Sequence, residues 1–258
     1  MKRTPALFIG HGSPMNAIED NAFSREWEAL GKRLGRPKAI LSVSAHWFTQ
    51  GTRIADGATN PMVYDMYGFP DELYRIVYPA PGAPEIARRV AGLIHRSTEF
   101  DSSWGLDHGT WSVLRRMYPT ADIPVFQLSV DHNATPHEHM AIGRELASLR
   151  DEGVLIFGSG NVVHNLGRIN WGMDGGYDWA DEFDGYIKRN VLARDFDRVA
   201  DYQQAGPSAR LAFPMLDHFA PLLYVLGAAD AADSVQVLTD ARMKGSLSMT
   251  SYLFQPAD

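Results

Sequence analysis

Short apolar runs alternate with amphipathic stretches along most of this chain. The apolar runs are typical of buried strands, and they cover 5–12, 38–47, 122–131 and 153–161. Helical spacing of apolar residues, bounded by caps, glycine or proline, predicts helices at 24–35, 84–96, 135–150, 181–193 and after Asp217. Near the end, 234–240 and 246–255 are predicted as strands that can pair in antiparallel fashion. This alternation predicts a three-layer α/β/α fold around a central mixed, partly parallel sheet.

One segment interrupts the alternation. Residues 51–84 are rich in glycine, proline, tyrosine and methionine, which predicts a long loop. Long loops inside compact domains are often lids or pocket walls, although the aromatic side chains here can equally pack beneath the loop. No composition break and no internal repeat divides the chain, so we expect residues 1–258 to form a single domain.

Composition excludes several classes of protein. The net charge is −7 and no basic stripe is present, which argues against a nucleic-acid partner. No apolar run is long enough for a membrane span, and the short one at the start is interpreted as the first strand, so a cytoplasmic protein is expected. The chain has no cysteine, which excludes disulfides, iron–sulfur clusters and thiolate nucleophiles. Any metal must therefore be held by imidazole and carboxylate groups.

Five histidines lie where the chain leaves an apolar run or enters a helix: His11, His46, His108, His164 and His218. In open α/β sheets, ligands bind beyond the carboxyl ends of the strands. We therefore expect His11, His46, the turn before His164, Asp131 and His132 to gather at that edge. Histidines grouped in this way can bind a metal or transfer a proton.

Each of these histidines also has a simpler interpretation. His11 can be a turn histidine beside a strand, and His46 can be a core histidine whose ring bonds a backbone carbonyl. Asp107 can orient His108 or merely cap a helix, and a helix N-terminus favours the neutral imidazole. His164 can be a ligand, a proton shuttle or a packed residue. His218 can be a third ligand or a surface histidine. By contrast, His137 and His139 lie in a polar first helical turn and are expected to be solvated.

Five ordered motifs carry a family resemblance: GHGSP, SAHW, LDHGTW, GSGNVVHN and DHFAPL. Together they resemble the class III extradiol ring-cleaving dioxygenases, in particular the subgroup that includes the 4,5-DOPA dioxygenases. The resemblance runs over nearly the whole chain, and five motifs in order are far more specific than any one of them. The family has an α/β fold with its metal at one edge of a central sheet.

The resemblance implies a non-haem metal held by His11, His46 and His218. It places His164 close to the metal, either as a fourth ligand or as the acid–base residue of catalysis, and makes His108 the other catalytic histidine. Non-haem Fe(II) oxygenases usually combine two histidines with one carboxylate, whereas three histidines are also found in catalytic zinc sites. Because zinc cannot cycle electrons, we expect Fe(II) as the working metal and Zn(II) as an ion that can occupy the purified protein.

The resemblance also implies a catechol substrate and dioxygen, with L-DOPA the favoured catechol. Ring opening would give a seco-DOPA that cyclises to betalamic acid or muscaflavin. Residues 132–136 partly match a substrate-pocket motif of the family, lacking two residues of its spacing, which assigns His132 and Thr135 to substrate binding. A substrate carboxylate could meet Arg53, Arg75 or Arg168.

Two other functions are compatible with the same histidines. A zinc-dependent hydrolase could use a three-histidine site to activate water, and a non-enzymatic metal-binding protein could keep the same fold. Histidines beyond the three ligands favour catalysis over storage. The strands near the C-terminus can pair between copies, so a homo-oligomer is a further expectation.

Overall fold

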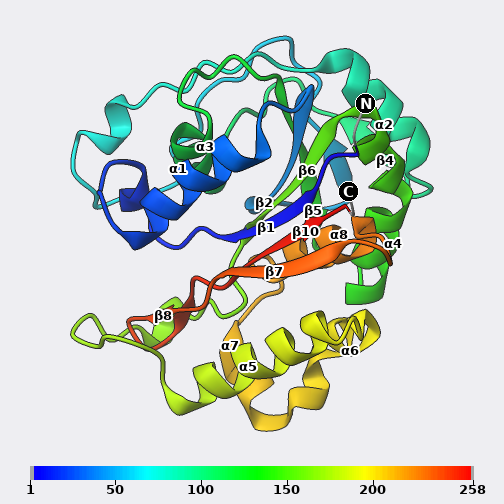
Figure 1. The fold of residues 1–258 in the computed structure, drawn as a ribbon. Helices are drawn as coiled ribbons and strands as arrows, with labels where there is room; N and C mark the ends of the chain where they lie inside the picture. The colour runs from blue at the N-terminus through cyan, green and yellow to red at the C-terminus, as the bar shows by residue number, and fades with distance from the viewer. Residues whose placement is uncertain (1–2, 257–258) are drawn as a thin grey trace.

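The computed structural model describes residues 3–256 and contains an eight-stranded sheet in the order β4-β3-β5-β2-β6-β1-β10-β7 (Figure 1). Its centre is parallel and consists of β5 (Val125–Asp131), β2 (Ala39–Thr49), β6 (Val154–Gly160) and β1 (Ala6–Gly10). On one side follow the antiparallel strands β10 (Ser251–Gln255) and β7 (Ser234–Thr239). On the other lie the short strands β3 (Thr52–Ile54) and β4 (Thr98–Phe100).

Helices cover both faces of the sheet, which confirms the three-layer prediction. Alternate residues of β1 enter different cores, because successive side chains of a strand point to opposite faces. Leu7 and Ile9 pack with the helices α1 (Ala22–Leu34) and α3 (His108–Met117). Ala6 and Phe8 pack in the other core with α2 (Pro84–Leu93), α4 (Pro136–Leu146), α5 (Asp178–Leu192) and α8 (Ala220–Ala228).

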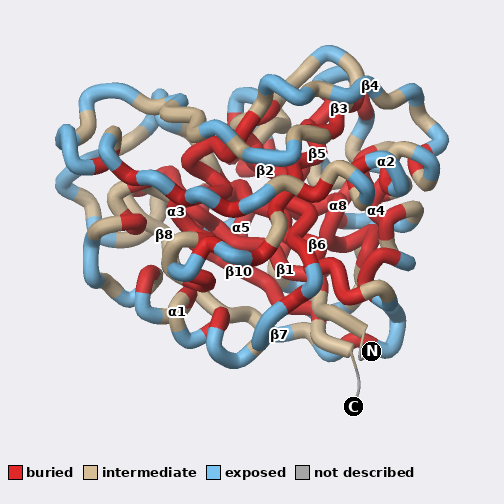
Figure 2. The backbone as a smooth tube through the Cα atoms, turned by 90° about the horizontal axis from the view of Figure 1, so that it is seen from above, coloured by how far each residue is buried: buried red, intermediate tan, exposed pale blue. Residues whose placement is uncertain are grey.

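The helix α8 is the most deeply placed helix of the second layer. All nine of its residues are buried, and its sequence is apolar all round, as expected for a helix inside a large core. Figure 2 shows the buried backbone running through the central strands and α8, with exposed loops outside them. Within residues 3–256, no helix is long and apolar enough to cross a membrane.

The remaining differences from the predicted elements are local. The predicted strand 246–255 is divided into β9 (Leu247–Ser248), which pairs with β8 (Arg242–Met243), and β10, where pairing with β7 is irregular at Ser251. The predicted loop 51–84 contains β3. The short helices α6 (Phe196–Ala200) and α7 (Ala209–Ala212) were not predicted, because four or five residues are too few to show a helical period.

Candidate metal centre and active site

Two of the five histidines reach the carboxyl edge of the sheet from neighbouring strands. His11 directly follows β1 and is 1% exposed. His46 lies inside β2 rather than at its end, because the strand continues to Thr49. Pairing of β2 with β5 is irregular between Val43 and Phe48. Such irregularities re-aim side chains, and this one lies where the strand presents His46.

His218 and His164 reach the same edge from loops. His218 precedes α8, and its carbonyl accepts a hydrogen bond of 2.8 Å from the backbone of Asn161, just past β6. A Cβ at Gly160 would lie 2.1 Å from that carbonyl oxygen, so only glycine permits this approach. The rings of His164 and His218 stack in parallel with centroids 3.4 Å apart.

The structure brings all five histidines into one cluster. The ring centroid of His11 lies 5.0 Å from that of His46, 5.4 Å from that of His218 and 5.7 Å from that of His108. The rings of His46 and His108 are 3.9 Å apart. The predicted gathering is therefore seen for His11, His46 and His164, and the structure adds His108 and His218 to it.

Hydrogen bonds fix which nitrogen of His11 faces the cluster. The hydroxyl of Ser159 donates to the carbonyl of Gly109 at 2.6 Å. That hydroxyl can then only accept at its 3.0 Å contact with Nδ1 of His11, so Nδ1 carries the proton. Nε2 of His11 is left with its lone pair.

The same argument holds for His46. Its Nδ1 lies 2.8 Å from a carboxylate oxygen of Asp65, which can only accept. Nε2 of His46 then also carries a lone pair, and it lies 3.1 Å from Nε2 of His11. Two lone pairs at this distance repel each other unless a proton or a metal ion lies between them.

His218 completes the group. One nitrogen from each of His11, His46 and His218 lies within 4.8 Å of the others. Both ring nitrogens of His218 are buried without a hydrogen-bond partner among residues 3–256, and the 3.2 Å approach of Nδ1 to Asp217 lacks hydrogen-bond geometry. Buried polar atoms of this kind require an explanation, and a metal ion supplies one. The residues present therefore fit a metal with imidazole ligands.

Burial favours the neutral form of three histidines in the cluster, His11, His164 and His218. Burial, followed by repulsion from the neighbouring imidazoles, holds the pKa values of His11 and His218 well below the usual range. Burial also lowers the pKa of His164, to about 4. Burial acts in the same direction on His46, but the hydrogen bond to Asp65 and the nearby carboxylates outweigh it and raise that pKa. Neutral imidazole is the form that binds metals.

Asp65 is the site residue that sequence reasoning missed. It lies in the segment 51–84, and its side chain is 20% exposed. Its second oxygen accepts from Nδ1 and from the backbone N–H of His108, both at 3.0 Å. Burial raises the pKa of Asp65, but the hydrogen bonds from His108 and His46 outweigh it and hold the pKa well below its usual range. A lone aspartate among aromatic residues gave no sequence signal.

His46, Asp65 and His108 form a second group with metal-ligand spacing. Ordinary hydrogen bonds already satisfy this group, whereas the group with His11 and His218 is left with facing lone pairs. The first group is therefore the better metal site.

Asp107 is the cap of α3 and not the partner of His108. Its carboxylate accepts from the backbone of Thr110 at 3.1 Å, from Ser44 at 2.6 Å and from Gln127 at 3.0 Å. His108 is the first residue of the helix, as predicted. Burial, followed by repulsion from His46, lowers the pKa of His108 against the opposing effect of Asp65.

Three predicted pocket residues have other contacts. Asp131 pairs with Arg96 at 2.9 Å. Thr135 is exposed and caps α4, with Glu138 completing the predicted capping box. His132 is exposed and lies beside the ring of Phe48, with centroids 5.8 Å apart. Within the described residues, no contact joins Thr135 or His132 to the histidine cluster, so their substrate-binding role stays a prediction.

The prediction that His139 is solvated is wrong. Its side chain is fully buried, and Nδ1 lies 3.0 Å from the hydroxyl of Tyr224 on α8. The polar first turn of α4 was misleading because His139 faces α8 whereas His137 faces outward and pairs with Asp201.

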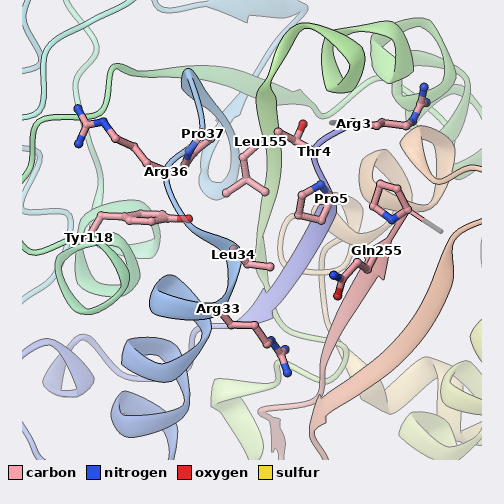
Figure 3. Close-up of a pocket in the computed structure, with 11 residues that line it drawn as sticks. Arg3, Thr4, Pro5, Arg33, Leu34, Arg36, Pro37, Tyr118, Leu155 and Gln255 are labelled. Atoms are coloured by element: carbon pink, nitrogen blue, oxygen red, sulfur yellow. The ribbon is translucent and has the colours of Figure 1, made fainter. Parts of the chain in front are cut away.

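The histidine cluster is distinct from the surface depression in Figure 3. That depression lies at the opposite edge of the sheet, where β1 and β6 begin, and is lined by Pro5, Leu34 and Leu155 among others. Arg3 and Arg36 at its margin point away from one another and pair with Asp151 and Asp122. It contains none of the five histidines.

Comparison with known proteins gives a consistent answer. Residues 5–255 match the family described as the catalytic LigB subunit of aromatic ring-opening dioxygenase. The chain is 46% identical over 255 residues to 4,5-DOPA dioxygenase extradiol from Escherichia coli (strain K12), covering 96% of this chain and 94% of that protein. It is 39% identical to 4,5-DOPA dioxygenase extradiol from Beta vulgaris, covering 96% and 95%.

A solved structure shows the same fold. The crystal structure of an uncharacterized protein from Escherichia coli K12 is similar with a TM-score of 0.86 and 43% sequence identity, covering 98% of this chain and all of that one. The family match over nearly the whole chain confirms the resemblance seen in the five motifs. The chain belongs to the LigB family and is an extradiol ring-cleaving dioxygenase.

Proposed function

We propose that this enzyme opens the ring of L-DOPA or a closely related catechol with dioxygen, using Fe(II) held by His11, His46 and His218. The observation that carries the metal site is the facing pair of Nε2 atoms on His11 and His46 at 3.1 Å. The relatives named 4,5-DOPA dioxygenase support the substrate class. They give no support to a zinc-dependent hydrolase.

Iron suits this reaction better than zinc. When bound, Fe(II) supplies a redox-active centre at which a catechol and dioxygen can meet, and zinc has no redox chemistry. As metal ligands the three imidazoles would carry no charge, but two carboxylates lie just outside them, Asp65 against His46 and Asp217 against His218. These carboxylates offset the metal charge, as the carboxylate ligand does in other non-haem iron sites.

We assign proton transfer to His108 and His164. Because Asp65 holds the proton on Nδ1 of His108, Nε2 of that ring is free to accept a phenolic proton. The lowered pKa of each histidine means that both are neutral near pH 7 and able to act as bases. A protonated histidine can then return the proton as the ring opens.

Among the three arginines considered for a substrate carboxylate, Arg168 fits best. Arg53 lies within 4 Å of Glu99 and Asp101, and Arg75 pairs with Asp71 on the same exposed turn. Arg168 has no ion pair among residues 3–256, is exposed, and follows His164 by four residues. We propose that its guanidinium meets the carboxylate of an amino-acid catechol.

The apolar side chains of the segment 51–84 divide between the core and the surface. Met62, Tyr64, Met66 and Phe69 pack against the core beneath the loop, as the simpler interpretation had it. Tyr67 is 92% exposed, two residues from Asp65, and Leu166 is 59% exposed, two residues from His164. We propose that these two side chains form part of an apolar rim at the site entrance.

The test is oxygen uptake by metal-free protein reloaded anaerobically with Fe(II) or Zn(II) and then given L-DOPA in air. Uptake with Fe(II) alone, with a yellow ring-opened product, is the expected result. Stoichiometric iron without uptake, for L-DOPA and for a panel of small catechols, would overturn the proposal. Replacing Arg168 by Gln should raise KM for L-DOPA but not for catechol itself.

A further inference from the structure

Asp65 contacts two histidines that have different proposed roles. One carboxylate oxygen lies 2.8 Å from Nδ1 of His46, a proposed metal ligand. The other lies 3.0 Å from Nδ1 of His108, a proposed acid–base residue. This second oxygen also accepts the backbone N–H of His108. A single side chain therefore joins the metal site to the proton-transfer site.

We propose that Asp65 is a positioning residue that fixes both His46 and His108 in the Nδ1–H form, so that Nε2 of each ring faces the site. The proposal rests on the metal site proposed above. An ionised carboxylate accepts hydrogen bonds and donates none, so both Nδ1 atoms facing it must carry protons. Partners of this kind, bound to the far nitrogen of a ligating histidine, set its tautomer and ring orientation.

Hydrogen bonds of the neighbouring residues hold the backbone near Asp65 in place, so that its carboxylate can fix the two rings. The N–H of Val63 donates to the carbonyl of Leu106 at 2.8 Å, and the indole of Trp111 on α3 donates to the carbonyl of Val63 at 3.2 Å. The hydroxyl of Tyr64 donates to the carbonyl of Ile76 at 2.5 Å. Asp65 is exposed as a residue, but its side chain is only 20% exposed because it lies against the two histidines, whereas Tyr67 is 92% exposed.

The variant Asp65→Asn distinguishes control of the histidine tautomers from a role of Asp65 in filling space. Asparagine matches aspartate in size, but one of its two terminal atoms is an NH2 donor. Because each Nδ1 faces a different terminal atom, asparagine cannot accept from both Nδ1–H groups. One of the two rings must then move its proton to Nε2. Glutamate is longer by one methylene yet keeps two acceptors. If Asp65 only fills space, Asp65→Asn should weaken Zn(II) binding less than Asp65→Glu does. If Asp65 controls the tautomers, Asp65→Glu should weaken it less than Asp65→Asn does.

The experiment measures Zn(II) affinity by competition with a chelator, and imidazole tautomers by NMR of metal-free protein labelled at the histidine nitrogens. Asp71→Asn is the matched control, because Asp71 lies in the same loop, is exposed and contacts Arg75. We expect Asp65→Asn to weaken Zn(II) binding by about 10- to 100-fold, the usual loss for an outer-shell partner. Asp65→Glu should lose less, and Asp71→Asn should bind as the wild type does.

Three results would overturn the proposal. One is a wild-type spectrum in which His46 or His108 carries its proton on Nε2, and this needs no variant. The second is Zn(II) affinity within twofold of wild type in Asp65→Asn. The third is a weaker affinity for Asp65→Glu than for Asp65→Asn. Because the readouts are affinity and tautomer, the proposal can fail while the oxygenase activity stands, and the reverse also holds.

Discussion

The two edges of the parallel sheet differ in whether their buried polar groups have partners within the protein. At the amino edge, where β1, β6 and β7 begin, Arg150 and Asp233 form an ion pair with side chains 0% and 1% exposed. Two hydrogen bonds of 2.7 and 2.9 Å join them, and Arg150 also donates to the carbonyls of Thr4 and Ala228. Both charges of this pair have their complement within the protein.

At the carboxyl edge the polar atoms do not complement one another. Nε2 of His11 faces Nε2 of His46, and His218 has two buried ring nitrogens without partners among residues 3–256. The ion pair at the amino edge is complete as folded, whereas the histidine cluster at the carboxyl edge requires a cation. Burial of polar groups thus stabilises the fold at one edge of the sheet and prepares a binding site at the other.

Breaking the ion pair at the amino edge should cost the most stability. Asp233→Ala leaves the guanidinium of Arg150 buried without its carboxylate, and such losses cost about 3–5 kcal/mol. Denaturant unfolding of the metal-free protein measures this. Zn(II) affinity of the folded fraction should not change. If the variant loses less than about 1 kcal/mol of unfolding free energy, the ion pair does not stabilise the fold as we propose.

Lowering the pH should destabilise the folded protein through the buried side chain of His139. Burial lowers the pKa of His139 from 6.5 to about 4, with smaller opposing and assisting effects from Asp131, Arg96 and Glu138. The unfolded chain therefore binds the proton first, so the stability contributed by neutral His139 is complete above pH 6.5 and is lost as pH falls toward 4. The full loss is about 3 kcal/mol.

Unfolding free energies of metal-free protein between pH 7 and pH 4 measure this effect. His139→Gln should flatten the profile, while His137→Gln on the exposed face of the same helix should leave it as steep as in the wild type. A profile equally steep in His139→Gln would assign the acid sensitivity to other groups.

Removing a proposed ligand should greatly weaken metal binding at the carboxyl edge. His218→Ala leaves two imidazoles, and we expect Zn(II) affinity to fall by more than about 100-fold, beyond the usual loss for an outer-shell partner. Calorimetric titration measures it, with His137→Ala as the control. Wild-type affinity in His218→Ala would remove His218 from the ligand set.

The smallest effect should come from the partner of His11. Ser159→Ala removes the acceptor for Nδ1 of His11, and we expect Zn(II) affinity to fall by about tenfold. Ser42→Ala is the control, because Ser42 is a buried serine of β2 whose hydroxyl contacts Thr110 instead. An equal loss in both variants would indicate general loosening of the sheet.

The sequence was informative where a local pattern determines the structure. The strand ending before His11 and the capping box of Thr135 and Glu138 were predicted because periodicity and capping act over a few residues. Asp65 and the burial of His139 were not, because both depend on packing between segments far apart in the chain. The single-domain, homo-oligomer and cytoplasmic assignments stay predictions.

The most direct test of this account is anomalous diffraction from crystals of the metal-free protein soaked with Zn(II). The account predicts one peak about 2.1 Å from a nitrogen of each of His11, His46 and His218, the usual zinc–imidazole distance. Asp65 should still lie against Nδ1 of His46. A peak between His46, Asp65 and His108, or none at the carboxyl edge, would contradict it.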